Sequence, residues 1–490
     1  MSISFLQVPF GVKVPGSYIE FDTSKAIQGP SIQTYVALLI GQRLSSGTKP
    51  AGQQDLVTSA AQAKQFYGAG SHLAAMAEAF INANGGLNEL TCIALDDGAA
   101  VKATGSYEIL TPPTADGTLS LMLAGRRYRV AVVDADTEED VIDKLVAEIG
   151  LDSDRLVDVV KNGGNGDLMD ITARNGGAVG NELDIRENYF VGEELPAGIT
   201  STITAMSGGS GDPSISGAIT AMGEKQFHSI AMAVNDASNI GLMQTEMQDR
   251  WGPTRQNDGH VFFAKNEDFA THSTFLGTRN NEQESVMNVK GPTPGFIWSA
   301  NLAAVIATNG QIDPARPFQT LSLTQVLAPL ESELFDFGER DQLLKAGSST
   351  YFVDGSGIVR IERIRTTRIE NEFGSLDEAL ADLNPKLTLS YIRFDYRTML
   401  TVKYPRHKLA NDGTNFGPGQ AIVTPRILKA EAVARFRQWE TLGLVEGGDQ
   451  FKRDLIIQRN TSDVNRADHL LSPDLVNQLR VNGVQIGFLL

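Results

Sequence analysis

The sequence predicts a multidomain protein that combines α/β and α+β parts. At 490 residues the chain exceeds what one hydrophobic core usually serves, so two to four domains are expected. Three apolar runs, each followed by a helical pattern, lie between residues 215 and 345 and indicate a small, mainly parallel α/β layer. Short strand patterns around one helix between residues 101 and 205 indicate a separate α+β part.

Residues 1–25 are expected to form an extended N-terminal arm or edge strand. Pro9, Pro15 and several glycines exclude a helix, and short apolar pieces alternate with polar ones. The apolar residues of this arm are Val12, Val14, Tyr18, Ile19 and Phe21.

Residues 26–100 are predicted to be the first part of a core α/β domain. The apolar and helical patterns follow one another as α/β units do. The expected elements are a buried strand within 31–41, helices near 60–66 and 71–82, and a strand at 89–94.

Residues 101–205 are predicted to be an inserted outer α+β domain. Strands are expected at 118–123 and 127–133, followed by a helix from Thr137, whose hydroxyl can form a capping box with Asp140. A second strand pair is expected at 169–173 and 182–186, joined by the glycine-rich stretch ARNGGAVGN. The following residues 206–214, MSGGSGDPS, have the composition of a linker.

Residues 215–345 are predicted to be an α/β domain built from three strand–helix repeats. Each repeat starts with an apolar run and continues with a helical pattern, which favours parallel strands. The strands are FHSIAMAV, HVFFA and SVMNV, and the helices cover 239–250, 268–276 and 296–309.

Residues 346–480 are predicted to be a C-terminal core domain. It should contain a strand pair at 349–353 and 358–366, then a helical stretch from Leu376 that is broken near Pro385. A further helix should begin at Thr424, a capping residue followed by proline at the first helical position.

Residues 481–490, VNGVQIGFLL, are predicted to form a C-terminal arm strand. In an extended chain, alternate side chains lie on the same side. The residues on that side are Val484, Ile486, Phe488 and Leu490. Because this strand ends the chain without a hairpin partner, we expect it to pair with something else.

Composition restricts the partners and the compartment. The formal net charge of −17 opposes binding to the polyanionic backbone of nucleic acid. No apolar stretch approaches the ~20 residues of a membrane span, and no secretory signal is expected, so assembly in the cytoplasm is predicted. The single cysteine, Cys92, cannot form an intrachain disulfide and is expected to be buried.

Charge is unevenly distributed along the chain. Residues 101–204 carry nineteen acidic and nine basic side chains, whereas residues 351–490 carry seventeen acidic and nineteen basic ones. This asymmetry suggests that the acidic part faces solvent and the nearly neutral part faces protein.

Motifs for catalysis or cofactor binding are not found. The chain has no GxxxxGK[ST], GxGxxG or GxSxG motif at a suitable turn, and its six histidines show no HxxxH or HExxH pairing. The acidic run at 134–140 is better explained by the N-terminus of a helix than by a cation loop. We therefore predict no catalytic, cofactor or metal residues, although an α/β enzyme assembled from distant residues within 215–345 stays an alternative.

Four segments resemble the tail sheath proteins of Mu-type contractile phages. They occur in the same order and span nearly the whole chain. These segments are VPGSYIEFDTSKA, ITARNGGAVGNELDIRENY, DPARPFQTLSLTQVLAP and LSPDLVNQLRVNGVQIGFLL.

The resemblance implies a discontinuous core domain with an inserted outer domain, and arms that add strands to sheets of neighbouring subunits. It also implies a homo-oligomer of stacked hexameric rings around a tail tube, which contracts and drives the tube through the host envelope. The implied partners are the tail tube, baseplate and tail terminator proteins, and the implied location is the virion tail. Another phage tail or baseplate protein, which would form a closed ring, is the structural alternative.

Seven residues are assigned more specific roles. Gly11, Gly16, Gly483 and Gly487 are possible arm hinges, with ordinary turns or bulges as the equal alternative. Arg426, Lys429 and Arg437 are possible tube-facing residues on one face of the helix after Pro425. The neighbouring apolar stripe comprises Leu428, Ala432, Phe436 and Trp439. Ordinary solvated charges are the alternative for the basic face.

Overall fold

A six-stranded sheet joins segments that are far apart in the sequence. The computed structural model describes residues 13–14, 17, 33–417 and 419–489. The sheet has the order β13-β12-β11-β1-β3-β2, and all of its pairings are parallel except that of β2 with β3. Its strands are β1 (Val36–Gln42), β2 (Gln54–Val57), β3 (Glu89–Leu95), β11 (Ser229–Met232), β12 (His260–Lys265) and β13 (Glu284–Asn288). The predicted parallel layer is therefore confirmed, and it also includes β1 and β3.

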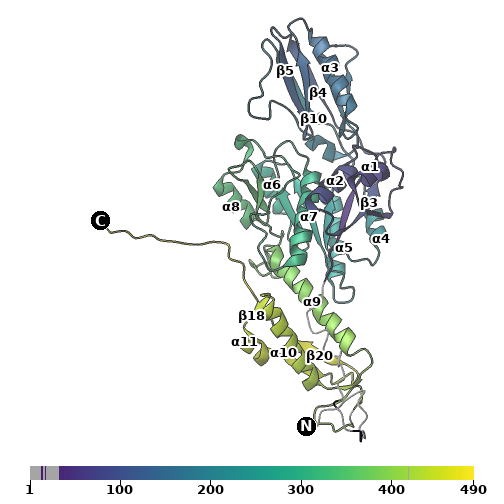
Figure 1. Ribbon diagram of the computed structural model, residues 1–490, viewed down its shortest axis with the longest axis vertical. Coiled ribbons are helices and arrows are strands. Elements are labelled where there is room, and N and C mark those ends of the chain that lie inside the picture. The colour runs from purple at the N-terminus through teal and green to yellow at the C-terminus, as the bar shows by residue number, and fades with distance from the viewer. Residues whose placement is uncertain (1–12, 15–16, 18–32, 418, 490) are drawn as a thin grey trace. The chain divides into compact units, whose positions relative to one another are not determined.

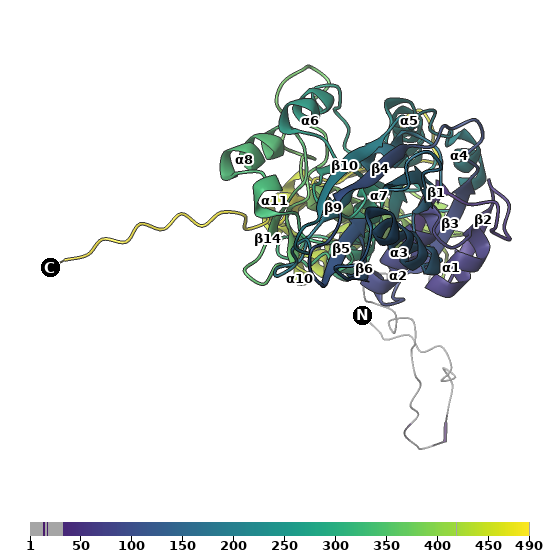
Figure 2. The same ribbon diagram turned by 90° about the horizontal axis from the view of Figure 1, so that it is seen from above.

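Helices pack against this sheet, and their starts follow from local sequence. Ser59, Ser71, Asp236 and Asp268 each accept a backbone hydrogen bond at a helix N-terminus. Helix α7 is buried along most of its length and packs on α2, β11 and β12 (Figures 1 and 2). The helices are α1 (Ala60–Tyr67), α2 (His72–Asn84), α4 (Ser216–Met222), α5 (Ala237–Trp251), α6 (Phe269–Leu276) and α7 (Gly295–Ile312).

The segment between β3 and α4 forms two further sheets, an α-helix and a 3₁₀ helix. The four-stranded sheet has the order β10-β4-β8-β7, and the three-stranded sheet has the order β6-β5-β9. Helix α3 (Glu138–Leu151) starts with the predicted capping box of Thr137 and Asp140. The strands are β4 (Thr104–Thr111), β5 (Gly117–Leu123), β6 (Arg126–Val132), β7 (Val157–Lys161), β8 (Leu168–Ala173), β9 (Ile185–Glu187) and β10 (Thr200–Ser207).

The predicted pairing of 169–173 with 182–186 is wrong. Strand β8 pairs with β4 and β7, whereas β9 pairs with β5 in the other sheet. The 3₁₀ helix η2 (Ala178–Glu182) lies between them, so the chain moves from one sheet to the other and does not form a hairpin.

Residues 206–214 are not an unattached linker. Met206 and Ser207 complete β10, and Ser210 bridges to Val101. The amide of Asn181 exchanges two hydrogen bonds with the backbone of Gly209, at 2.9 and 2.8 Å. Close backbone approach requires glycine at position 209, because a Cβ there would lie 2.4 Å from the Gly177 carbonyl oxygen.

The chain divides into two compact units. One comprises Thr34–Ser390 and Asn477–Leu490, and the other contains Tyr391–Val476. The predicted boundary at 345–346 does not coincide with this division, because the backbone of Ser349 donates to Val286 on β13 at 2.7 Å. The first unit, here called the α/β unit, therefore includes η3 (Glu331–Glu333), α8 (Phe337–Lys345) and the hairpin β14 (Thr350–Val353) and β15 (Val359–Arg363).

The unit that contains Tyr391–Val476, here called the C-terminal unit, is built around helices. Helix α10 (Pro425–Thr441) is capped by Thr424 as predicted, and Phe436 stacks on Phe451 of α11 (Gly448–Asp454) with ring centroids 4.1 Å apart. Its short strands are β16 (Lys408–Leu409), β17 (Ile422–Val423), β18 (Val445–Glu446), β19 (Ile456–Arg459), β20 (Ala467–Leu470) and β21 (Asp474–Leu475).

Helix α9 (Leu383–Lys403) corrects the prediction of a helix from Leu376 with a break at Pro385. Leu376 instead bridges to Glu370 in a turn, and the helix begins at Leu383. Pro385 lies in the first turn, where its missing N–H leaves no intrahelical acceptor unpaired. Of the helices in the described ranges, none is both long and apolar enough to cross a membrane.

Candidate assembly surfaces

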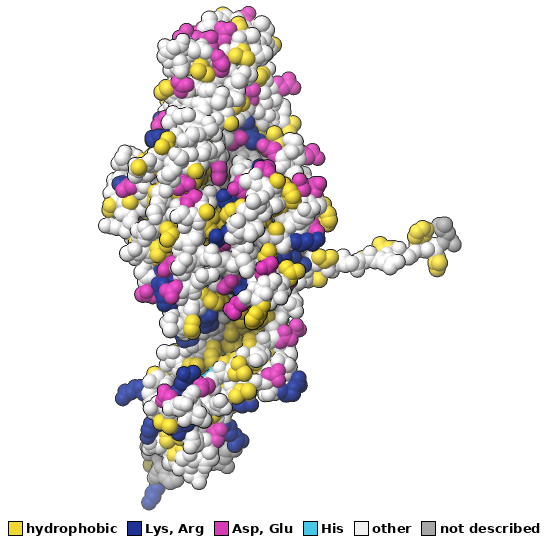
Figure 3. All heavy atoms as spheres, turned by 180° about the vertical axis from the view of Figure 1, so that it is seen from behind, with side chains coloured by type: hydrophobic (Ala, Val, Ile, Leu, Met, Phe, Trp, Pro, Cys, Tyr) yellow, Lys and Arg dark blue, Asp and Glu magenta, His cyan; other side chains and the backbone are white. Residues whose placement is uncertain are grey.

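The C-terminal arm presents apolar side chains to solvent. Residues 481–489 have no helix or strand, and in the described ranges no strand pairs with them. Val484, Ile486 and Phe488 are 79, 85 and 80% exposed, and Figure 3 shows hydrophobic side chains along this segment. Leu490 lies outside the described residues. Exposed apolar residues at alternate positions are typical of a segment that adds a strand to another sheet.

Most of the predicted N-terminal arm residues cannot be placed. Val12, Tyr18, Ile19 and Phe21 lie outside the described residues, as do Gly11 and Gly16. Val14 is described and exposed. At Gly483 and Gly487 a Cβ would meet no atom within 4 Å, and neither has a positive φ. Local geometry therefore does not require glycine at these two positions, and their hinge role stays a prediction.

The predicted apolar stripe and basic face of α10 are both present. Leu428, Ala432, Phe436 and Trp439 are buried. Arg426, Lys429 and Arg437 are exposed. The Lys429 ammonium donates to the Leu455 carbonyl oxygen at 2.7 Å. Arg426 and Arg437 thus provide the exposed charges of this face, whereas Lys429 is also tied to its own unit.

A two-stranded sheet in the C-terminal unit offers apolar side chains at its end. Strand β19 pairs with β20 in antiparallel register, and Ile456 lies opposite Leu470. Both side chains are about half exposed. Within the described residues each strand has one partner only, so the sheet has edges at which a further strand can pair.

The crevice at the carboxyl ends of β1 and β3 is filled by the chain itself. In open α/β sheets, ligands bind at the carboxyl ends of the strands, where the connections of two neighbouring strands go to opposite sides of the sheet; here this point lies between β1 and β11, next to the β1–β3 pair. Here Gln42, at the end of β1, donates to the Gly176 carbonyl oxygen at 2.5 Å and to Asp97 at 2.8 Å. The buried Asn175 donates to Asp97 at 2.9 Å and accepts from the backbone of His72 at 3.1 Å. The inserted segment therefore covers the carboxyl ends of β1 and β3.

Buried ionisable groups line this filled crevice. Burial lowers the pKa of His72 to about 3 and raises the pKa of Glu182 to about 7. Glu182 accepts from Asn235 at 3.2 Å, and its other oxygen is buried without a hydrogen-bond partner. Shifted pKa values are typical of active sites, but His72 faces Asn175 of the inserted segment, and Glu182 belongs to that segment and faces Asn235.

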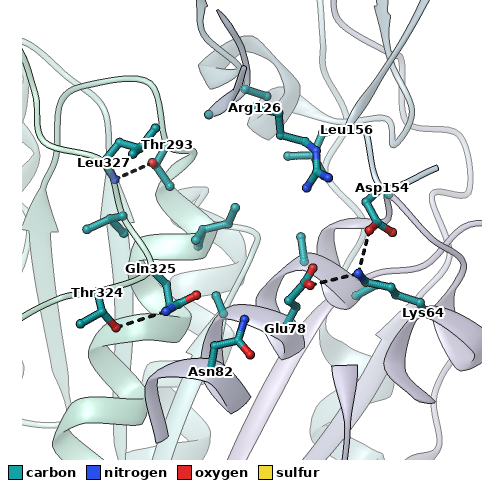
Figure 4. A pocket seen from close by; sticks show the side chains of 18 residues that line it. Lys64, Glu78, Asn82, Arg126, Asp154, Leu156, Thr293, Thr324, Gln325 and Leu327 are labelled. Carbon is teal, nitrogen blue, oxygen red and sulfur yellow. Dashed lines mark hydrogen bonds and ion pairs between the residues drawn. The ribbon is translucent and has the colours of Figure 1, made fainter. Parts of the chain in front are cut away.

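A cavity of about 370 Å³ lies between α2, α7 and the segments around Arg126 and Asp154 (Figure 4). The Lys64 ammonium bonds to Asp154 at 2.7 Å and to Glu78 at 3.0 Å. Burial by itself lowers the pKa of Lys64, but these two carboxylates outweigh it and raise the pKa. Lys64, Glu78 and Asp154 thus satisfy one another, Arg126 pairs with Asp152 outside the residues drawn, and no nucleophile with an adjacent base is formed by the residues drawn.

Sequence reasoning missed two groups of residues. Asn175 and Glu182 lie within one of the four motifs, and Arg480 lies within another, but nothing local indicates their contacts. Asp395, which is buried against Arg435 and Trp439, was missed as well. The signal that identifies Asp395 is a charged residue on the inner side of a helical pattern.

Comparison with known proteins identifies the family. Residues 208–367 match the phage tail sheath protein central domain, and residues 375–486 match the phage tail sheath C-terminal domain. The chain is 41% identical over 492 residues to the Mu-like prophage FluMu tail sheath protein of Haemophilus influenzae, and the alignment covers all of both chains.

Solved sheath structures are similar at low sequence identity. The sheath tail protein of Desulfitobacterium hafniense is 12% identical with a TM-score of 0.48, over 94% of this chain and 100% of that one. A contracted sheath complex of an extracellular contractile injection system, PVC, is 9% identical with a TM-score of 0.49, over 98% of both chains. The two domain matches and the full-length relative show that the chain belongs to the Mu-like phage tail sheath protein family and is a tail sheath subunit.

Proposed function

We propose that this subunit polymerises as stacked six-membered rings around a tail tube and contracts to drive the tube through the host envelope. The observation that carries the proposal is the exposed, alternating apolar C-terminal arm. A segment of this kind gains backbone hydrogen bonds and buries its side chains when it pairs with a sheet edge of a neighbour. Burying Val484, Ile486 and Phe488 contributes ~1.5–3 kcal/mol for each side chain, enough for a specific contact.

The edge of the β19–β20 sheet is the proposed receiver of a neighbour's arm. Its exposed Ile456 and Leu470 supply apolar contacts beside backbone groups that have no strand partner in the described ranges. A contact between an arm and a different surface on the next subunit is heterologous, so it produces a ring where the rotation closes and a helical polymer where it does not.

Contraction requires no nucleotide in this proposal. Asn175 and Gly176 of the inserted segment cover the carboxyl ends of β1 and β3 in the parallel sheet. The energy comes from two packings of the subunit interfaces, as in other switching assemblies. The arms keep neighbouring subunits connected while their bodies move.

The tail tube is the proposed partner of the basic face of α10. Arg426 and Arg437 are exposed there, and positive charges steer and orient contact with an acidic surface. Baseplate and tail terminator proteins are the proposed partners at the two ends of the polymer, and assembly is proposed to occur in the host cytoplasm.

The test compares the full-length protein with a variant that ends at Arg480, by negative-stain electron microscopy. The truncation removes only residues that are exposed or outside the described ranges, so the fold is expected to persist. We expect filaments or tubes with ring striations for the full-length chain and dispersed particles for the truncation. Identical closed rings of fixed size in both samples contradict the proposal. Dispersed particles in both samples are examined again with tube protein, and continued failure to assemble contradicts the proposal too.

A further inference from the structure

Arg480 marks the point at which the C-terminal arm leaves the folded protein. Its side chain is 15% exposed, whereas all residues from 481 to 489 are exposed. One guanidinium nitrogen, Nη2, donates to Oδ1 of Asn384 at 2.9 Å. The arm therefore begins at a fixed site and not at an arbitrary position in a flexible tail.

The acceptor of Arg480 is held in place by its own contacts. Asn384 is fully buried in the first turn of α9. Its amide nitrogen donates to the carbonyl oxygens of Pro314 and Arg316, at 2.9 and 2.8 Å. These two bonds fix the orientation of the amide, so that its oxygen is directed to Arg480.

A shared carboxylate adds charge to this site. Asp382 accepts two hydrogen bonds of 2.8 Å from Arg363, and its Oδ2 lies 3.8 Å from Nη2 of Arg480. Because one carboxylate faces two guanidinium groups, its attraction for Arg480 is partly offset by Arg363. Arg480 is thus bound through geometry and hydrogen bonding more than through net charge.

Two longer contacts support the same attachment. Gln319 donates to the Leu479 carbonyl oxygen, and Gln478 donates to the Ala315 carbonyl oxygen, both at 3.4 Å. Two segments that were noted separately in the sequence, 313–329 and 471–490, therefore meet at the root of the arm.

The chain passes from the C-terminal unit to the α/β unit four residues before Arg480. Up to Val476 the chain belongs to the C-terminal unit, where the Val476 backbone donates to Leu444 at 3.2 Å. From Asn477 onward it belongs to the α/β unit. The contacts of Arg480 are all within the α/β unit, so they determine to which unit the arm is attached.

We infer that Arg480 is a positioning residue that joins the C-terminal arm to the α/β unit, so that a load on the arm passes into that unit and not into the C-terminal unit. This inference rests on the proposed function, because a load arises only if the arm links sheath subunits. If the contact of Arg480 and the two longer contacts at Gln478 and Leu479 were all lost, the arm would start after Val476 and gain four residues. The local concentration of its tip would fall only about 1.7-fold, so polymerisation is a poor test and attachment must be measured directly.

The test uses spin labels on cysteines at exposed positions, because the native Cys92 is buried and should not react. One pair, Ile312→Cys with Val481→Cys, reports the arm root against the α/β unit. The other pair, Leu442→Cys with Val481→Cys, reports it against the C-terminal unit.

Double electron–electron resonance should give a narrow distance distribution for the first pair, which becomes at least twofold wider with Arg480→Ala. Arg480→Lys should widen it as well, because lysine lacks the planar fork by which Nη2 of Arg480 reaches Asn384 and Nη1 reaches Oε1 of Gln319 at 3.4 Å. The matched control Arg453→Ala, on the exposed face of α11, should leave it unchanged.

The functional readout is the fraction of assembled tails that contract fully after a denaturant trigger. Arg480→Ala should polymerise within about twofold of the wild type but contract fully at least fivefold less often. An unchanged distance distribution, or normal contraction of Arg480→Ala sheaths, overturns the inference. If the wild-type chain does not polymerise, the proposed function fails, and the distances still decide whether Arg480 attaches the arm.

Discussion

The indole nitrogen of Trp439 on α10 donates a 2.7 Å hydrogen bond to the buried carboxylate of Asp395 on α9. The other oxygen of Asp395 faces Arg435 at 3.3 Å. A charged group at this depth is stable only when its partners remain in place. The contacts of Asp395 with Trp439 and Arg435 therefore fix α9 against α10 within the C-terminal unit, which carries the proposed tube-facing residues.

Removal of this carboxylate should destabilise the C-terminal unit strongly. Asp395→Ala leaves Arg435 and the Trp439 N–H without this acceptor, and we expect a loss of about 3–5 kcal/mol in the free energy of unfolding. Trp439→Phe removes one hydrogen bond and some volume and should cost about 1–3 kcal/mol. Urea denaturation measures both values. The exposed substitution Glu440→Gln is the control, and a cost for Asp395→Ala as small as that of the control would contradict this description of the unit.

The side of the arm that carries Val484, Ile486 and Phe488 should matter for assembly. Phe488→Asp places a charge where an apolar contact is proposed, and we expect it to abolish polymerisation seen by sedimentation and electron microscopy. Gln485→Asp introduces the same charge on the opposite side and should reduce polymerisation much less. Both residues are exposed, so the melting temperature of the unassembled protein should be unchanged within about 1 °C. Equal effects of the two substitutions would show that the arm does not pair as a strand.

Charge reversal should separate tube binding from folding. Changing Arg426, Lys429 and Arg437 to Glu should abolish co-assembly with the tail tube, because charges that attract an acidic surface then repel it. The change at Lys429 also removes its bond to Leu455, so a small stability cost is expected there. The matched control changes three exposed basic residues of the α/β unit, Lys102, Arg129 and Lys345, to Glu. Normal sheathed tubes with the first variant, or equal loss with the control, would argue against a tube-facing α10.

Protonation of Glu182 should make stability depend on pH. Burial raises its pKa to about 7, above the value near 4.5 expected in the unfolded chain. The contribution of neutral Glu182 to the free energy of unfolding is therefore fully present below about pH 4.5 and is lost as pH rises through 7. The free energy of unfolding changes by about 2–3 kcal/mol over this range. Glu182→Gln keeps a neutral side chain at every pH.

The measurement is the free energy of unfolding of both proteins at pH 5 and pH 8. Glu182→Gln should equal the wild type at pH 5 within about 1 kcal/mol and exceed it at pH 8 by about 1–3 kcal/mol. The difference between the two proteins cancels contributions from other titrating groups. A difference that does not change with pH would show that Glu182 is already ionised in the folded protein.

Much of the fold could be predicted because its elements have strong local signals. The parallel strands are continuous apolar runs, and α3 and α10 start at Thr137 and Thr424, which cap them as the sequence indicates. The pairing of β9 with β5 could not be predicted, because it depends on strands that are about sixty residues apart. The predicted start of α9 is wrong because proline can end a helix or occupy its first turn, and Pro385 does the latter.

The candidate site was predicted only in part. The buried stripe of α10 follows from helical periodicity, whereas the pairing of the C-terminal arm as a strand stays a prediction because residues 481–489 form no strand. The filled crevice and the contact of Arg480 with Asn384 could not be predicted, because each joins segments whose local sequence gives no sign of the partner. Such contacts are properties of the assembled fold and are found only when the side chains are placed.

The most direct test of the central claim is electron cryomicroscopy of the polymer formed by the full-length chain. The proposal predicts a helical or stacked-ring lattice in which residues 481–490 form a strand in a sheet of the neighbouring subunit, with Arg480 still bound to Asn384. A polymer in which residues 481–490 remain unpaired, or a closed ring of fixed size, would contradict it.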